Sequence, residues 1–339
     1  MGITIKELSE ISGYSPSTIS RVITNKGNVK KETREKVERL LQEYDYRISI
    51  MELRSTANTK NNVLIIVGDI HNWYYMEIVS EISKILNENG LMSIIGFSDN
   101  NESQQNMFLQ KAFEQNYAGT IFLNVIDGEE LRQMIKQQEH PVVFLNRGLK
   151  SMDLEVDVIR SDNYWGGYLA TKHLIDMGHR KIAHLTGSLY SATTFERMRG
   201  YEDAMRDARL AVTKNSIFYG DLKSESGYAF GENYIKKGLD YTAVFCGNDL
   251  MAVGVMHAMR DYGVSIPDDI SVICYDDTPL VADGRIRMTT VGVKASKMAR
   301  GAIELLLSKI NGSEQETKTI LYKPQLHVRD SVKKIKNDL

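Results

Sequence analysis

The sequence predicts an α/β protein that carries a separate, small helical domain at its N-terminus. From residue 62 onward, aliphatic runs alternate with stretches long enough for amphipathic helices, which is typical of parallel sheets with helices on both faces. Residues 1–60 instead show three short helical patterns. The chain of 339 residues is also longer than one hydrophobic core usually serves, so we expect two or three domains.

The expected strands of the larger part are short and strongly aliphatic. They are residues 63–67, 92–97, 120–125, 142–145, 182–185, 216–219, 243–246 and 270–274. Runs of this kind do not by themselves distinguish one α/β fold from another. The polar stretch 56–62, which precedes the first of them, is interpreted as a linker.

Composition and the longest apolar run exclude several classes of protein. Apolar residues make up 42% of the chain and charged residues 25%, as in ordinary globular proteins rather than disordered or fibrous ones. Residues 63–67, the longest aliphatic run, fall far short of the roughly 20 residues that cross a bilayer, and no apolar signal segment opens the chain. We therefore expect no membrane partner and a cytoplasmic location. Cys246 and Cys274 lie in strand-like runs and are expected to be buried, and we expect no metal and no cofactor.

The net charge of −2 conceals an uneven distribution along the chain. Residues 1–60 contain 11 Lys and Arg against 8 Asp and Glu, a balance of +3, so the remainder carries −5. Seven of those basic residues lie within residues 20–39. Such clustering at one end is typical of a small DNA-binding module attached to a near-neutral body, although a basic helical face can also be simply solvated.

Three short helices are expected within residues 1–46. The first begins at Thr4, where Thr-Ile-Lys-Glu has the pattern of a capping box, and ends at Gly13. The second begins at Ser15, an N-cap followed by proline at the first helical position, and the third spans about 31–44. The core predicted for these helices consists of Leu8, Ile11, Ile19, Val22, Ile23, Val37, Leu40, Leu41 and Tyr44.

The second helix is expected to present a polar face to solvent, formed by Ser17, Thr18, Ser20 and Arg21. In a helix-turn-helix, the outward face of the second helix enters the major groove, where short hydroxyls suit base edges and phosphates. Arg21 is the best candidate for a bidentate contact with guanine. The alternative is an ordinary helical hairpin with a solvated polar face.

Residues 4–8, 13–23 and 32–37 have the sequences TIKEL, GYSPSTISRVI and ETREKV. These segments resemble the headpiece of lactose/galactose repressor-type regulators. The resemblance implies that a set of polar side chains faces bases and nearby phosphates, while others contact the DNA backbone. The first set is Ser15, Pro16, Ser17, Ser20 and Arg21, and the second is Thr4, Asn28, Thr33 and Tyr46. Thr24 replaces the asparagine usual after the recognition helix, and Asn25, which follows, is added to the candidates.

The hinge after the headpiece departs from this resemblance. Such regulators carry Tyr-x-Pro-Asn and then a short helix whose leucine wedges into the minor groove, whereas residues 46–55 lack the Pro-Asn pair. Met51 and Leu53 are the candidates for the wedge. We assign residues 1–46 to the headpiece and 47–61 to the hinge and linker.

The resemblance continues into the larger part, at residues 69–75 (DIHNWYY), 178–182 (GHRKI), 196–201 (ERMRGY), 247–252 (GNDLMA) and 267–272 (PDDISV). It implies two lobes similar to periplasmic binding proteins, with chain crossovers near residues 160, 291 and 322. The implied first lobe is 62–160 and 292–322, the second is 161–291 and 323–330, and 331–339 is a polar tail. A small-molecule effector would bind between the lobes, at the carboxyl ends of strands.

Loop residues that follow the strands supply the candidate effector contacts. They are Asp69, Trp73, Tyr74, Arg147, Tyr190, Thr193, Arg197, Leu222, Asn248 and Asp276. Aromatic faces with Arg, Asn and Asp suit the C–H faces and hydroxyls of a sugar, although a purine also stacks on aromatic rings. Packing is the alternative for each aromatic residue, and an ion pair that holds the loops together is the alternative for Arg197 and Asp276.

The predicted function is that of a transcriptional repressor controlled by a sugar or sugar derivative, with no enzymatic activity. No nucleotide-binding, hydrolase or metalloprotease motif is present, and residues 1–60 do not suit a transport-binding protein. A nucleobase or a phosphocarrier protein remains an alternative effector. The C-terminus lacks the leucine heptads of a tetramerisation bundle, so we expect a homodimer on a near-palindromic double-stranded operator.

Overall fold

The computed structural model describes residues 5–23, 29–43, 59–137, 139–149, 154–189, 191–313 and 316–335. The chain divides into two compact units, Met1–Asn61 and Asn62–Leu339. Several candidate residues lie outside the described ones, namely Thr4, Asn25, Asn28, Tyr46, Met51, Leu53 and Tyr190. Among the described residues, none of the helices is long and apolar enough to cross a membrane.

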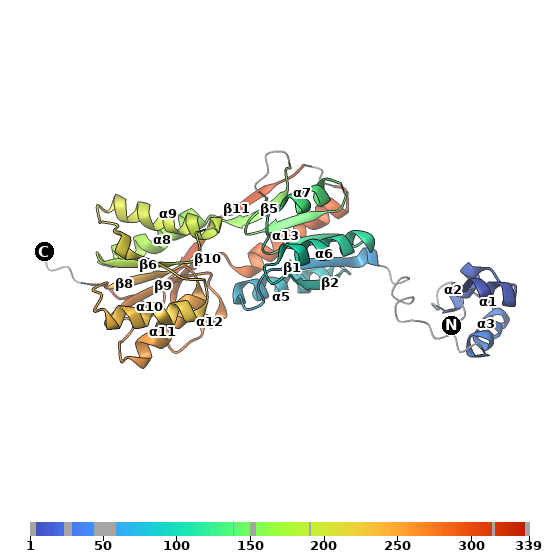
Figure 1. Ribbon diagram of the computed structural model, residues 1–339, viewed down its shortest axis with the longest axis horizontal. Helices are drawn as coiled ribbons and strands as arrows, with labels where there is room; N and C mark the ends of the chain where they lie inside the picture. Colours follow the sequence, from blue (N-terminus) through green and yellow to red (C-terminus); the bar gives the residue numbers. More distant parts are fainter. Residues whose placement is uncertain are drawn as a thin grey trace. The chain divides into compact units, whose positions relative to one another are not determined.

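The first unit contains α1 (Ile5–Ser12), α2 (Pro16–Ile23) and α3 (Lys31–Glu43), as expected (Figure 1). Gly13 has φ +70, the left-handed conformation that favours glycine after a helix. Ser15 caps α2, because the Thr18 amide donates to its Oγ at 3.2 Å. The buried core is formed by Leu8, Ile19, Val22 and Val37, with Leu40 and Leu41 packed partly against it.

The prediction that Ile11 belongs to this core is wrong. Its side chain is 49% exposed, whereas that of Leu8 is 2% exposed. Both residues lie on α1, which has only 8 residues. A core of so few buried side chains covers the position of Leu8 but not the last turn of the helix.

The second unit contains two six-stranded sheets, which we call the sheets of lobe 1 and lobe 2 (Figure 1). The lobe 1 order is β11 (Thr319–Tyr322), β5 (Asp157–Ser161), β4 (Val142–Leu145), β3 (Gly119–Phe122), β1 (Asn62–Val67) and β2 (Met92–Phe97). The lobe 2 order is β12 (Gln325–His327), β10 (Thr289–Gly292), β9 (Ser271–Tyr275), β8 (Ala243–Cys246), β6 (Ile182–Thr186) and β7 (Ile217–Tyr219). Neighbouring strands are parallel except for β10 and β12. The predicted α/β fold class is confirmed.

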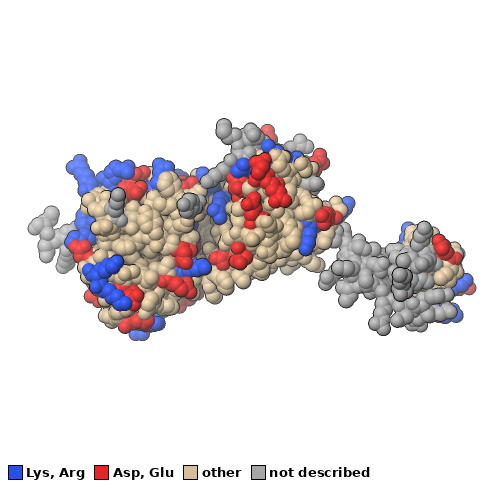
Figure 2. Space-filling view, viewed as in Figure 1, with Lys and Arg blue, Asp and Glu red and all other residues tan. Residues whose placement is uncertain are grey.

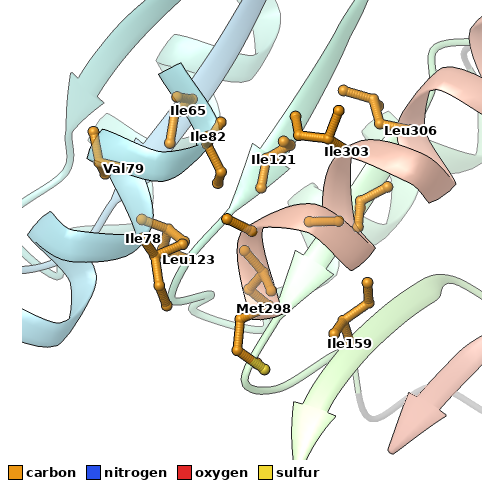
Figure 3. Close-up of a cluster of buried hydrophobic side chains, with 14 of the residues drawn as sticks. Ile65, Ile78, Val79, Ile82, Ile121, Leu123, Ile159, Met298, Ile303 and Leu306 are labelled. Atoms are coloured by element: carbon orange, nitrogen blue, oxygen red, sulfur yellow. The ribbon is translucent and has the colours of Figure 1, made fainter. Parts of the chain in front are cut away.

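Helices cover both faces of the lobe 1 sheet because alternate residues of its strands are apolar. On β1, Val63, Ile65 and Val67 face α5 (Trp73–Glu88) and α13 (Ala295–Ile310), and Figure 3 shows this cluster. Leu64 and Ile66 face the opposite cluster, which includes side chains of α6 (Glu102–Glu114) and α7 (Glu129–Lys136). The strand is therefore buried on both sides, as expected for a parallel sheet.

The lobe 2 sheet is covered in the same way (Figure 1). Helices α8 (Asn163–Asp176) and α9 (Ala192–Asp207) pack around Tyr201 and Phe245 on one face. Helices α10 (Ser224–Lys236) and α11 (Asp249–Asp261) pack around Phe230 and Met251 on the other, and α12 (Pro279–Ala282) adds Val281. Cys246 and Cys274 are free and buried, as predicted.

The interpretation of residues 331–339 as a polar tail is wrong for the residues that the structure describes. Ser331 and Val332 are buried, and the Ser331 Oγ donates to the Val272 carbonyl at 2.5 Å. The Ile335 amide donates to the Met177 carbonyl at 2.8 Å. Residues 331–335 therefore belong to lobe 2, because their backbone and hydroxyl groups satisfy groups along β9 and α8.

We predict that Leu8→Ala unfolds the headpiece while the larger unit stays folded. Deleting a buried leucine costs about 2–5 kcal/mol, a large loss for so small a core. Circular dichroism during heating should show an early loss of helix followed by the unchanged main transition. Ile11→Ala, on the same helix, should change stability by only about 0.5 kcal/mol, as expected for an exposed site. Equal effects of the two substitutions would contradict the structure of this core.

Candidate functional site

The outward face of α2 carries hydroxyl groups and one guanidinium. Ser15, Pro16, Ser17 and Arg21 are exposed, and Thr18 is half-buried. The Ser15 Oγ lies 2.8 Å from the Ser17 Oγ and 2.9 Å from the Thr18 Oγ1. No acidic residue lies in the first turn of α2, so the face is suited to phosphate and base edges.

Two other headpiece candidates complete this description. Thr33 is half-buried in the first turn of α3. The side chain of Ser20, on α2, lies outside the described ones. The structure therefore places four of the candidates together at the N-terminal half of α2 and its preceding loop, namely Ser15, Pro16, Ser17 and Thr18, with Arg21 on the next turn.

Two cavities lie between the lobes of the second unit. One, of about 610 Å³, is lined by Ile70 and Trp73 of lobe 1 and by Lys223 and Leu250 of lobe 2. The other, of about 660 Å³, is lined by Arg147 and neighbouring residues of lobe 1 and by Ala192 of lobe 2. Figure 2 shows a furrow along this boundary on the face in view. We call the space between the lobes the cleft.

The side chain of Arg197, on α9, is the centre of a buried network in lobe 2. Its Nε donates to the Asn163 Oδ1 at 2.9 Å, and its Nη1 donates to the Gly247 carbonyl at 2.6 Å. Its guanidinium carbon lies 3.6 Å from the centroid of the Tyr275 ring. Its Nη2 is 3.6 Å from the Asp276 Oδ1. The two candidates Arg197 and Asp276 are therefore adjacent in the folded protein.

The backbone at Asp276 is strained. Its φ is +118, a conformation that residues other than glycine rarely adopt. The neighbouring strand approaches closely at Gly292, where a Cβ would lie 2.6 Å from the Asp276 carbonyl oxygen. Strain of this kind persists only where surrounding contacts impose it, and it is frequent at binding sites.

Burial raises the pKa of the Asp276 carboxyl from 3.8 to about 8, and the charge of Asp249 acts in the same direction. Arg197 opposes this shift because it stabilises the ionised carboxylate. The folded protein therefore favours a protonated Asp276 over a pH range in which the unfolded chain carries it ionised. A buried carboxyl with such a shifted pKa is a candidate for a functional role.

Tyr74 fits the packing alternative. Its ring is buried in the lobe 1 core, and its hydroxyl donates to the Val293 carbonyl at 2.9 Å. Burial raises the pKa of this hydroxyl well above 10.0, and the Asp276 charge contributes, so Tyr74 lies close to the cleft. Its neighbour Tyr75 was not among the candidates. Burial raises the pKa of its hydroxyl, the charge of Arg147 lowers that pKa, and the charge of Asp276 raises it.

Asn248 and Leu222 interact with each other rather than with an open cavity. The Asn248 Nδ2 donates to the Leu222 carbonyl at 2.8 Å, and its Oδ1 caps α11 by accepting from the Met251 amide at 3.0 Å. Both ends of the amide are thus satisfied within lobe 2. Leu222 has φ +67, so its loop is held in an unusual conformation by this contact.

Of the remaining described candidates, Trp73 and Arg147 line the two cavities, while Asp69 and Thr193 are chain neighbours of the lining residues Ile70 and Ala192. Trp73 is 53% exposed, and Arg147 donates to the Asn124 side chain. The Asp69 carboxylate accepts from the His71 amide at 2.8 Å. The Thr193 Oγ1 lies 2.9 Å from the Ser191 Oγ, at the beginning of α9.

An ion pair that was not foreseen joins the lobes. The Nη1 of Arg160, on β5 of lobe 1, lies 3.2 Å from the Oε1 of Glu196, on α9 of lobe 2. Near it, the Ser161 Oγ lies 2.9 Å from the Tyr275 hydroxyl. Glu196 belongs to the segment ERMRGY that carried the resemblance, but nothing in its sequence indicates a partner so distant along the chain.

Residues 4–49 match the family model described as bacterial regulatory proteins, lacI family, and residues 171–332 match that of a periplasmic binding protein-like domain. The HTH-type transcriptional repressor PurR of Vibrio campbellii is 30% identical over 333 residues, which cover 98% of this chain and 99% of that protein. The chain belongs to the lacI family of bacterial regulatory proteins. PurR of Vibrio vulnificus is 31% identical over 333 residues, covering 98% of this lacI-family protein and 99% of its own length.

Solved structures agree with this membership. A transcriptional regulator CelR–cellobiose complex matches this lacI-family protein with a TM-score of 0.73 and 27% identity, covering 97% of this chain and 99% of that one. The Lac repressor dimer bound to operator and the anti-inducer ONPF matches with a TM-score of 0.73, 22% identity and coverage of 98% and 100%, which shows the fold alone. The predicted resemblance and the predicted function as a DNA-binding transcriptional regulator are confirmed.

We predict that Asp276→Asn removes a pH-dependent loss of stability. A carboxyl with a raised pKa binds its proton more tightly when folded, so the protein loses stability as pH rises from about 4 toward 8. The variant lacks this loss, and its free energy of unfolding relative to the unaltered protein should rise by at least about 1.4 kcal/mol, the equivalent of one pKa unit. Urea unfolding across that range measures it.

Asp330→Asn is the matched control. The pKa of Asp330 is lowered by its hydrogen bond with Arg287, so this variant should lose stability without changing the slope between about pH 5 and 8. A slope unaffected by Asp276→Asn would show that the carboxylate at this position is ionised throughout.

Proposed function

We propose that this protein is a repressor whose headpiece binds an operator and whose cleft binds a sugar or sugar derivative that controls DNA binding. The observation that carries the proposal is the cleft itself, with two cavities of about 610 and 660 Å³ lined by both lobes. Volumes of this size are typical of small-molecule sites. A ligand held by both lobes binds one lobe arrangement better than another, which is the requirement for control.

The chemistry of the walls favours a polyhydroxylated ligand. Trp73 offers an exposed ring to the first cavity, and Arg147 offers a guanidinium to the second. Arg197 and Asp276 lie 3.6 Å apart in lobe 2, outside the lining of both cavities, and we propose that a bound ligand reaches them as a donor and an acceptor. The CelR structure, 27% identical, holds cellobiose, which supports a sugar. The PurR relatives keep a nucleobase as the alternative, and a phosphocarrier protein also stays open.

A homodimer follows from the apolar edge of lobe 1. The edge strand β2 exposes Met92, Ile95 and Phe97 to 59%, 43% and 42%, and Met107 on α6 is 43% exposed. Exposed edge strands with apolar side chains are usually covered by a partner. A second copy of the chain would cover this edge and place two headpieces on a near-palindromic operator. We place this regulator in the cytoplasm and assign it no enzymatic activity.

We predict that Arg21→Ala lowers operator affinity and relaxes base preference, because a bidentate contact with a base contributes about 1–3 kcal/mol of discrimination. Lys30→Ala with Lys31→Ala should weaken all sequences alike and flatten the salt dependence, since phosphate contacts carry no sequence information. Mobility-shift series on operator and scrambled DNA measure both. Arg39→Ala, which removes one positive charge from α3, is the control for Arg21→Ala, which removes one positive charge from α2. An unchanged base preference in Arg21→Ala would show that α2 does not read the bases.

We also predict that Arg197→Ala and Asp276→Ala lower effector affinity by about 1.5–3 kcal/mol, the contribution of a hydrogen bond to a charged group. The effector is first found by thermal shift with mono- and disaccharides, cellobiose included, and with purine nucleobases. Effector and operator affinities are then measured separately. Arg287→Ala, which breaks an exposed pair with Asp330 at 2.8 Å in the same lobe, is the control.

The ion-pair alternative has a different outcome. If Arg197 and Asp276 only hold the loops of lobe 2 together, both variants lose stability without effector and retain effector affinity. That result would refute their assignment as ligand contacts.

A further inference from the structure

A third cavity lies where the chain crosses between the lobes, separate from the two cavities of the cleft. Its volume is about 260 Å³. Four of its lining side chains are basic, namely Lys294, Lys297, Arg300 and Lys323. Ser296 and Gln325 add polar groups to the lining.

These residues come from two of the segments in which the chain passes between the lobes. Lys294 follows β10 of lobe 2 and directly precedes α13 of lobe 1. Lys323 lies between β11 of lobe 1 and β12 of lobe 2. The pairing of Gly292 with Gln325 holds the two segments side by side. The fold therefore brings together lysines that are distant in the sequence.

The positive charges of this cavity are not balanced by its lining, which contains no Asp or Glu. Exposed basic residues elsewhere do pair with carboxylates, as Lys172 does with Asp176 and Lys236 with Glu232, at 2.9 and 2.8 Å. Lys297 instead lies over the Tyr322 ring, with its Nζ 4.6 Å from the centroid. Like charges gathered around one space repel one another, so an anion at this position would lower their electrostatic energy.

The start of α13 contributes in the same direction. Its N-cap is Lys294, whose side chain makes no capping hydrogen bond, and no acidic residue lies in the first turn. The N-cap and first turn of this 16-residue helix line the cavity with Lys294, Ser296 and Lys297, and the start of a helix carries the positive end of the helix dipole. The basic side chains and the beginning of the helix therefore both favour a negatively charged ligand.

We propose that this third cavity is an anion site that takes a phosphate group, either inorganic phosphate or the phosphate of a small metabolite. Lysine and arginine donate charge-assisted hydrogen bonds to phosphate oxygens. The volume of 260 Å³ suits a phosphate or a small ester and is less than half that of either cleft cavity. The site does not use the residues assigned to the effector in the cleft.

The test uses the full-length protein and inorganic phosphate, titrated calorimetrically at constant ionic strength maintained with chloride. Saturable binding of one anion per chain is expected. Lys294→Gln with Lys323→Gln should weaken binding by at least about tenfold, which is the low end of the loss expected for charge-assisted hydrogen bonds. The control, Lys84→Gln with Lys111→Gln, removes the same charge from exposed positions on α5 and α6 and should bind phosphate as the unaltered protein does.

A second arm distinguishes the source of the phosphate. Glucose 6-phosphate is titrated beside glucose. If glucose 6-phosphate binds more tightly than inorganic phosphate, and Lys294→Gln with Lys323→Gln abolishes that binding, the ligand is a metabolite ester. Absence of saturable binding, or an equal loss in the control, overturns the proposal. Phosphate binding that is lost in Arg197→Ala but kept in the lysine variant also overturns it, because the anion then occupies the cleft.

Discussion

The buried guanidinium of Arg197 is the interaction on which the rest of the cleft depends. It joins Asn163 at the beginning of α8 to the carbonyl that follows β8, and it lies over Tyr275 at the end of β9. Leaving such partners unsatisfied costs about 1–3 kcal/mol for each buried polar group. The ends of these elements are therefore held in one position, and lobe 2 presents a preformed wall to the cleft.

The sequence predicted the elements whose stability is local. Each of the eight aliphatic runs corresponds to an observed strand, and a central strand such as β8 is apolar throughout because helices cover both of its faces. The strands that escaped prediction are β5, β10, β11 and β12. β5 has the sequence DVIRS and β10 has TTVG, so polar and apolar residues mix within them. Their pairing is decided by distant strands, which a local pattern does not show.

The sequence predicted which residues lie near the ends of strands, but not which partners their side chains contact. Placing polar residues after strand ends identified Arg197 and Asp276, which the fold does bring together. The same rule selected Asn248 and Tyr74, whose polar groups are used for capping and for the Val293 carbonyl. The Asn248 Oδ1 has its partner three residues away, but the Asn248 Nδ2 and the Tyr74 hydroxyl have partners 26 and 219 residues away. Spacing along one segment carries no such information.

The position of two contacts between the lobes indicates how a bound molecule could act on the whole unit. Arg160 with Glu196 and Ser161 with Tyr275 lie where the chain leaves β5, close to a crossover. Contacts near an axis of rotation change little when the lobes rotate, so they hold the lobes together without fixing one angle. For the same rotation, the distance between the two lobes changes more at positions farther out in the cleft, where ligand groups lie. Binding free energy from those groups would therefore select between lobe arrangements, while the contacts of Arg197 hold the ends of α8, β8 and β9 together within lobe 2.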